Sequence, residues 1–288
     1  MVFEKVLVPV DGSELSDRVL EQLRPVLLRE DVELLLLRVV SPVAGESERA
    51  SQERFDAATA HVERLRAGLE ARGVSARARV VRGDPAAVIL EQVAAEAPSL
   101  VAMSTHGRSG PARWVRGSVA ERVLRACPAP LLLANTAAID RGAAGPWTRV
   151  LVPLDGSSEA EAVLPLAVEL ARLHGGEVEL FRVGWFAPAA MDYAVPAPIY
   201  PASLDELLAG LEPARARAAL AGVRVSKRAV HGLPAEAILA EAERVPGTLV
   251  AMTTHGRSGV DRWVLGSVAE NVLRACTTPV LLSRVAAS

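Results

Sequence analysis

The chain contains the same sequence twice. The segment at 104–118 reads STHGRSGPARWVRGS, and the segment at 253–267 reads TTHGRSGVDRWVLGS. Over the wider ranges 100–135 and 249–284, 26 of 36 aligned positions are identical. Such a repeat predicts two copies of one folding unit. Each half of the 288 residues is long enough to bury a core of its own.

Within each half, short apolar runs alternate with segments of helical periodicity. In the first half we predict strands at 5–10, 32–40, 75–81, 100–103 and 130–134. The segments between them predict helices at 16–29, at about 50–72, from Pro85 onward and at 118–126, with Ser13 or Ser16 capping the first. Strands that alternate with helices predict a doubly wound α/β domain with a five-stranded parallel sheet. Ligands of such sheets bind at the carboxyl ends of the strands, where the strand order reverses.

The pattern restarts after a segment that is typical of a linker. Residues 137–147 are mostly small and contain two glycines and a proline. We therefore predict one domain at 1–136 and a second at 148–288. The offset between the halves grows from 144 at Asp11 and Asp155 to 149 at Gly83 and Gly232, and we place the extra residues in the segment 184–201. This aromatic-rich segment is either a packed connection, which we favour, or a lid or partner surface.

Composition and charge exclude several classes of function. The net charge is −2 and no basic run is present, so nothing favours binding to DNA or RNA. No uncharged stretch reaches the roughly 20 residues that span a bilayer. The N-terminus lacks the pattern of a signal peptide. The two cysteines, Cys127 and Cys276, fall at the same place in each repeat and are expected to be small buried side chains. We expect a reduced, cytoplasmic protein without a membrane partner.

The repeated loop has the residues that a phosphate site requires. Its glycines let the backbone approach a ligand, and its arginine adds a permanent positive charge. A Gly-Ser pair then opens the next helix, so free N–H groups and the positive end of the helix dipole face the loop. These residues are Gly107, Arg108, Gly117 and Ser118 in the first copy, and Gly256, Arg257, Gly266 and Ser267 in the second. We expect the loop histidines, His106 and His255, only to orient the loop by a hydrogen bond.

Taken together, these features resemble the universal stress protein family. The matching features are VLVPVDGS and VLVPLDGS at the start of each half, GDP and GLP after the third strand, and HGRSG followed by GSVAE before the last helix. The resemblance covers nearly all of both halves, so the chain is identified as a tandem universal stress protein. It implies the adenine nucleotide alpha hydrolase-like fold, with strand order 3-2-1-4-5 in each domain.

The resemblance also implies a ligand, ATP with Mg²⁺ or Mn²⁺. The first glycine of the family's nucleotide motif is replaced here by Ser104 and Thr253. In the family, the aspartate after the first strand lies near the ribose and phosphates or their metal ion, which implies this role for Asp11 and Asp155. A turn residue that bonds its own backbone is the other interpretation of Asp11. Besides the loop residues, the resemblance places at the two nucleotide sites Pro9, Val10, Asp11, Val39, Met103, Ser104 and Val119, and Pro153, Leu154, Asp155, Val183, Met252, Thr253 and Val268.

The resemblance predicts a cytoplasmic ATP-binding module of stress response and regulation. Any ATP hydrolysis is expected to be slow, because no GxxxxGK[ST] loop or paired base and nucleophile is found. Two alternatives stay open: an interaction scaffold that kept the fold without the ligand, and a nucleotide-processing enzyme of the same superfamily. Because Asp261 places a like charge beside the second loop, we expect Gly117→Asp to weaken ATP binding more than Gly266→Asp.

The family pairs its domains edge to edge through the last strand. Here the strand at 130–134 is therefore expected to pair antiparallel with 279–283 inside one chain, which closes two exposed sheet edges. The resemblance leaves room for a homodimer of chains as well.

Overall fold

A computed structural model of the chain describes residues 3–27, 29–104, 118–134, 147–184, 202–254 and 265–284. The elements of the first half are β1 (Lys5–Val10), α1 (Glu14–Gln22), α2 (Arg24–Leu27), β2 (Glu33–Val40), α3 (Glu48–Glu70), β3 (Ser75–Arg82), α4 (Pro85–Glu96), β4 (Leu100–Ser104), α5 (Ser118–Ala126) and β5 (Leu131–Ala134). Those of the second half are β6 (Arg149–Pro153), α7 (Ser158–Glu161), α8 (Leu164–His174), β7 (Glu177–Gly184), α9 (Leu204–Ala209), α10 (Glu212–Ala219), β8 (Val225–His231), α11 (Pro234–Arg244), β9 (Thr248–Thr253), α12 (Ser267–Ala275) and β10 (Val280–Ser283).

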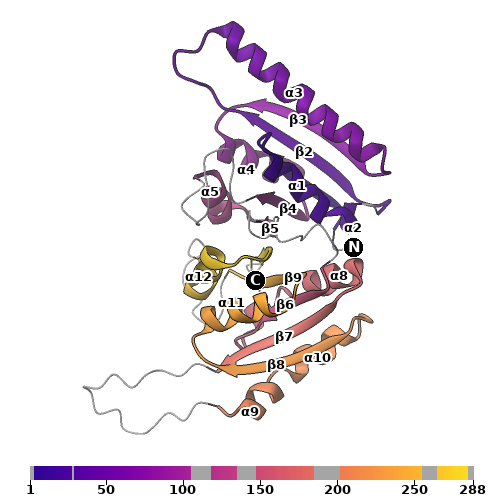
Figure 1. Ribbon diagram of the computed structural model, residues 1–288, viewed down its shortest axis with the longest axis vertical. Helices are drawn as coiled ribbons and strands as arrows, with labels where there is room; N and C mark the ends of the chain where they lie inside the picture. The colour runs from indigo at the N-terminus through magenta and orange to yellow at the C-terminus, as the bar shows by residue number, and fades with distance from the viewer. Residues whose placement is uncertain are drawn as a thin grey trace, which may run out of the picture.

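The described strands form one ten-stranded sheet in the order β3-β2-β1-β4-β5-β10-β9-β6-β7-β8. Within each half the neighbouring strands are parallel, and their order is the predicted 3-2-1-4-5. The predicted α/β fold of two repeated domains is therefore confirmed. Figure 1 shows the first half above the second, with helices packed along the sheet in each half.

The two halves meet at β5 and β10, the last strand of each. These strands run antiparallel, with Leu133 opposite Val280 and Leu131 opposite Leu282. They are the strands that were expected to pair. The pairing leaves β3 and β8 as the outer edges of the sheet.

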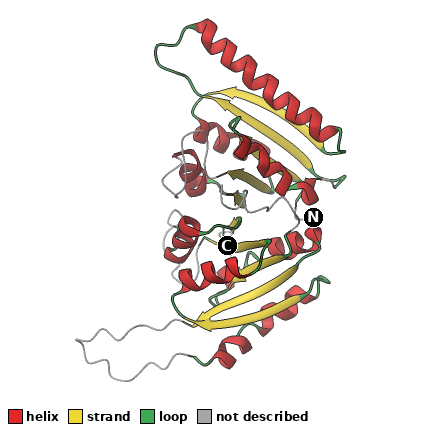
Figure 2. Ribbon diagram, in the orientation of Figure 1, coloured by secondary structure: helices red, strands yellow, loops and turns green. Residues whose placement is uncertain are grey.

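A buried apolar cluster lies on each face of the sheet. Side chains alternate between the two faces of a strand, so β1 sends Val6 and Val8 into one cluster and Leu7 into the other. Helices α1, α2, α3, α8 and α10 cover the first face, and α4, α5, α11 and α12 cover the second (Figure 2). Leu132 and Leu281 lie in one cluster while Leu133 and Leu282 lie in the other, so both cores continue across the junction of the halves.

The first helix differs from the prediction in its bounds. It begins at Glu14 rather than at 16, and it ends at Gln22 instead of continuing to 29. Ser13 is the N-cap, because its hydroxyl accepts a hydrogen bond from the backbone N–H of Ser16 at 3.2 Å. The chain then makes a separate short helix, α2. Pro25 has no N–H to donate, so an unbroken helix through this position would lose a hydrogen bond.

Other expectations concern the cysteines, the linker, the segment 184–201 and membrane-spanning helices. Cys127 and Cys276 are both buried, as predicted, and neither forms a disulfide; burial raises the pKa of both thiols. Of the predicted linker, only Trp147 lies among the described residues, and of the segment 184–201 only Gly184 does. In the described part of the chain, no helix has the length and apolar character of a membrane span.

Candidate functional site

The carboxyl ends of β1, β2 and β4 meet at one edge of the first domain. β1 lies between β2 and β4, so the strand order reverses there and the following loops diverge. Asp11 follows β1 directly, next to the point where Val10 pairs with Arg38 of β2. β4 ends at Ser104, and α5 begins at Ser118. The structure therefore places Asp11 and Ser104 at the switch point of the sheet, where a ligand is expected.

Asp11 forms a tight turn and keeps its charge. Its Oδ1 accepts hydrogen bonds from the backbone N–H of Ser13 at 2.9 Å and from the Ser13 hydroxyl at 2.5 Å. Burial raises the pKa of the carboxyl, but the bonds from Ser13 and Ser16 and the positive charge of Arg38 together hold it below its usual value. The turn interpretation of Asp11 is thus observed, and the same turn fixes an ionised carboxylate at the edge.

The second domain repeats this turn. Oδ1 of Asp155 accepts from the backbone N–H of Ser157 at 2.9 Å and from its hydroxyl at 2.5 Å. Ser157 caps α7 as Ser13 caps α1, because its hydroxyl accepts from the N–H of Ala160 at 3.1 Å. The two halves therefore present the same carboxylate in the same local geometry.

An arginine beside each aspartate was not predicted from the sequence. Nη1 of Arg38 donates to the carbonyl oxygen of Val10 at 3.2 Å, and Nη2 of Arg182 donates to that of Asp155, also at 3.2 Å. Each guanidinium lies over the glycine after the aspartate: a Cβ on Gly12 would come within 3.2 Å of Arg38, and one on Gly156 within 2.6 Å of Arg182. Both glycines have positive φ, +77° and +87°, which glycine adopts without strain. The available signal was one arginine at the same register of two otherwise apolar runs, LLLLRVV at 34–40 and LFRVG at 180–184.

The other predicted site residues differ in how far they are exposed to solvent, and some of them lie outside the described residues. Pro9, Val39, Ser104, Val119, Pro153, Val183, Gly266 and Val268 are partly exposed, and Ser118 and Ser267 are exposed. Val10, Met103, Leu154, Met252 and Thr253 are buried. Gly107, Arg108, Gly117, Gly256 and Arg257 lie outside the described residues, as do His106 and His255.

The two halves differ at the position of the missing motif glycine. Ser104 is partly exposed at the end of β4, whereas Thr253 is buried in β9, with 6 % of its surface exposed. Beyond Thr253, the N–H of Thr254 donates to the carbonyl of Ser283 at 3.0 Å, and the N–H of Gly266 donates to the carbonyl of Thr254 at 2.8 Å. The backbone at the start of α12 is therefore tied to the end of β9.

An apolar groove between α11 and α12 is present in the second domain and begins at the predicted site. Its lining is Leu233, Pro234, Ala235, Glu236, Leu239, Ser267, Val268, Asn271, Arg274 and Ala275. In the first domain, Asp84 and Arg122 form an ion pair of 2.8 Å between α4 and α5. The aligned residues of the second domain are Leu233 and Asn271, which do not form such a pair. The side chains at this position therefore differ between the two copies, an ion pair in the first and Leu233 with Asn271 in the second.

Metal binding by protein groups alone is not supported in the described ranges. No three His, Cys, Asp or Glu side chains gather there in an arrangement that holds a metal ion. Asp11 and Asp155 are each a single carboxylate at the sheet edge. Mg²⁺ is commonly held by one or two carboxylates together with substrate phosphates, so the residues present fit a nucleotide-bound ion.

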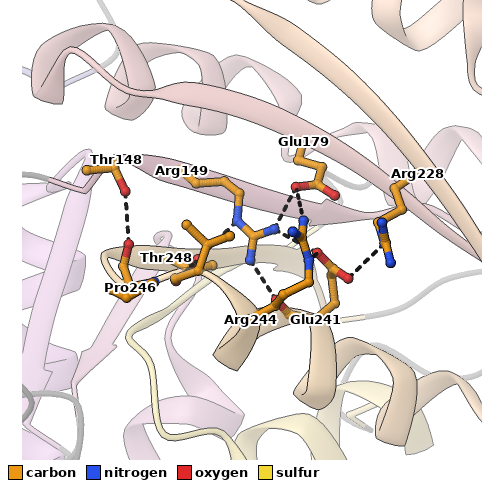
Figure 3. Close-up of polar contacts among 9 residues, drawn as sticks. Thr148, Arg149, Glu179, Arg228, Glu241, Arg244, Pro246 and Thr248 are labelled. Carbon is orange, nitrogen blue, oxygen red and sulfur yellow. Dashed lines mark hydrogen bonds and ion pairs between the residues drawn. The ribbon is translucent and has the colours of Figure 1, made fainter.

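A buried ionic cluster lies at the opposite, amino edge of the second domain (Figure 3). The guanidinium of Arg149 is 2.6 Å from Glu179 and 2.7 Å from Glu241, and its Nε donates to the Thr248 hydroxyl at 3.0 Å. Arg244 reaches Glu241 from the protein surface at 2.6 Å. Burial raises the pKa of Glu241, but its arginine partners lower it by more. Because the cluster lies at the amino edge, remote from the carboxyl edge, it takes no part in the ligand site.

The chain is built of two tandem, doubly wound α/β domains. Each domain carries an aspartate directly after its first strand, at the switch point of its sheet. The model of the universal stress protein family matches residues 3–135 and 146–284, so the chain belongs to this family. The predicted family is thereby confirmed.

Individual relatives agree with this assignment. The chain is 31% identical to the universal stress protein YxiE of Bacillus subtilis over 147 residues, which are 48% of this chain and 99% of that protein. It is 24% identical to a universal stress protein of Mycolicibacterium smegmatis over 97% of this chain and 96% of that one. The crystal structure of a universal stress protein from Archaeoglobus fulgidus covers 98% of both chains with a TM-score of 0.72 at 26% identity.

Proposed function

We propose that the protein binds ATP with Mg²⁺ at the carboxyl edge of each domain and acts in the cytoplasm as a nucleotide-dependent module of stress response. The observation that carries the proposal is the repeated pair of Asp11 with Arg38 and Asp155 with Arg182. Each pair fixes a carboxylate and a guanidinium at a switch point. A site for Mg-ATP needs both signs of charge, one for the metal or ribose and one for the phosphates.

The residues of the first domain have separable roles in this proposal. Asp11 holds the ribose or the Mg²⁺, which when bound neutralises phosphate charge. Arg38 and the N–H groups at the start of α5 attract the phosphates. Pro9 and Val39, which are partly exposed beside Asp11, supply apolar contact for the adenine. The second domain repeats these roles with Asp155, Arg182, Pro153 and Val183.

Hydrolysis of the bound nucleotide is proposed to be slow at most. Among the described residues, the Ser13 hydroxyl contacts Asp11 directly, and it is already engaged with the carboxylate and with the first turn of α1. We expect turnover far below about 10 s⁻¹, which is a typical enzyme value. A steady-state phosphate-release assay that shows rapid turnover would instead support the nucleotide-processing alternative.

Equilibrium dialysis against labelled Mg-ATP tests the proposal. We expect saturable binding by the natural protein and strong loss of it in the double variant Asp11→Asn and Asp155→Asn. Asparagine keeps an oxygen that accepts the turn hydrogen bonds but removes the charge. Asp56→Asn is the matched control, since Asp56 is exposed on α3 and bonds only Gln52 among the described contacts. Absence of binding in the natural protein would support the interaction scaffold.

We also propose that two chains associate as a homodimer. The strands β5 and β10 already pair with each other inside the chain, so a homodimer must use another surface. Sedimentation velocity tests this point, because a monomeric mass across a wide range of concentrations would contradict it.

A further inference from the structure

The first residue after β10 reaches across the junction into the first domain. Nη2 of Arg284 donates to the carbonyl oxygen of Leu124 at 3.0 Å and also contacts the carbonyl oxygen of Arg125. Leu124 and Arg125 lie in the last turn of α5, 160 and 159 positions away in the sequence. A side chain of the second domain thus closes the end of a first-domain helix.

This contact has the chemistry of a helix C-cap. The last carbonyl groups of a helix have no partner within the helix, and they carry the negative end of its dipole. A guanidinium satisfies both needs, because it donates several hydrogen bonds and carries a positive charge. The basic residue in the last turn of α5 itself, Arg125, pairs with Glu121 at 3.1 Å. Arg284 therefore supplies a cap that the described contacts of Arg125 do not.

The two halves of the repeat differ in sequence at the position of Arg284. The position of the first half that aligns with Arg284 is Asn135, a shorter and neutral side chain. Arg284 therefore links the second domain to α5 through a charged side chain that has no charged counterpart at the aligned position of the first domain. The halves are alike in fold but unequal in this link.

We infer that Arg284 is a positioning residue for the nucleotide site of the first domain, and that the second domain controls that site through α5. The inference rests on the proposed function. α5 is nine residues long, which corresponds to about 13 Å, and its opposite end begins at Ser118, a residue of the proposed nucleotide site. A short helix held at its C-terminus by Arg284 and packed by Val123 and Leu124 presents its N–H groups in one fixed direction. Loss of the cap loosens that direction and weakens phosphate binding.

Hydrogen exchange tests the positioning without any nucleotide. The full-length variant Arg284→Ala is compared with Arg284→Lys, which keeps a charged donor, and with Arg274→Ala, whose partner Glu270 lies in its own helix. We expect the amides of α5 to exchange about tenfold faster in Arg284→Ala, while those of α12 do not change. Arg284→Lys should restore much of the protection, and Arg274→Ala should not affect α5. Unchanged exchange in α5 would overturn the inference.

Nucleotide binding then tests the link to the site. A Gly266→Asp background is expected to weaken the second site, so that dialysis against Mg-ATP reports mainly on the first. We expect Arg284→Ala to weaken this binding about five- to tenfold, with partial recovery in Arg284→Lys. If exchange in α5 becomes faster but the affinity for Mg-ATP does not change, Arg284 does not influence the nucleotide site, and that part of the inference is wrong. If the natural protein binds no Mg-ATP, the proposed function fails, and hydrogen exchange alone decides whether Arg284 positions α5.

Discussion

The indole of Trp147 stacks on the imidazole of His174, with the ring centroids 4.1 Å apart and the planes inclined by 18°. The backbone N–H of Trp147 also donates to Nδ1 of His174 at 3.0 Å. Trp147 is fully buried at the start of the second domain, and His174 ends α8. The pair fastens the beginning of this domain to its first long helix.

This contact predicts a loss of stability in mild acid. Burial lowers the pKa of His174 to about 4, below its ordinary value of 6.5. Between these two pH values, His174 is protonated in the unfolded chain but not in the native protein. The free energy of unfolding therefore falls as the pH drops from about 6.5 to about 4. Between pH 7 and pH 5 we expect the free energy of unfolding to fall by about 2 kcal/mol from this group.

The variant His174→Asn isolates this contribution. Asparagine offers an oxygen to the Trp147 N–H and does not titrate. Denaturant unfolding at pH 7 and pH 5 should show a smaller acid loss in the variant than in the natural protein. Equal losses in both proteins would show that the imidazole is not the group responsible.

The buried cluster around Arg149 predicts unequal effects at two aligned positions. Arg149→Met removes the buried arginine that contacts both Glu179 and Glu241 and leaves them only partners from the half-exposed Arg244 and Arg228. We expect a cost of about 3 kcal/mol, the lower end of the range for breaking a buried ion pair. The aligned residue of the first half is Lys5, which forms a partly exposed pair with Glu96 at 3.1 Å. Lys5→Met should cost less than about 1 kcal/mol. Denaturant unfolding of both variants checks the difference, and similar costs would refute it.

The aligned helices α4 and α11 differ in whether a side chain caps their N-terminus. The Asp84 side chain accepts from the N–H of Ala87 at 2.9 Å at the start of α4, whereas the aligned Leu233 gives α11 no side-chain hydrogen bond. Leu233 is 50 % exposed, so its replacement forfeits little apolar burial. We expect Leu233→Asp to raise the free energy of unfolding by about 1 kcal/mol, and Asp84→Leu to lower it by a similar amount. A lower melting temperature for Leu233→Asp would contradict this.

Arg38 predicts a specific loss at the first nucleotide site. Arg38→Met removes the guanidinium over Gly12 but keeps a long side chain on β2. We expect Mg-ATP affinity at that site to fall about 10- to 100-fold, since a charge-assisted hydrogen bond contributes about 1.5–3 kcal/mol. Arg64→Met, on the exposed side of α3, is the control. Calorimetric titration in a Gly266→Asp background measures the effect, and equal affinities for the two variants would argue against a phosphate role for Arg38.

The sequence alone predicted most of the fold, because the repeat and the alternating apolar runs are local signals. It also predicted that Asp11 lies at the carboxyl edge, because the residue that directly follows a parallel strand lies at the carboxyl end of that strand. It did not predict Arg38, whose role depends on the register between β1 and β2. Nor did it predict the contacts of Arg149 or Arg284, which join segments about 30 to 160 positions apart. Such contacts leave no periodic signal in the chain.

The measurement that tests the central claim most directly is the nucleotide content of the purified protein. The chain is heat-denatured, and the released ligand is identified and quantified by chromatography before and after incubation with Mg-ATP. The account predicts ATP at one or two equivalents per chain after loading, and less in the Asp11→Asn and Asp155→Asn double variant. A protein that releases no nucleotide, even after incubation with Mg-ATP, would contradict it.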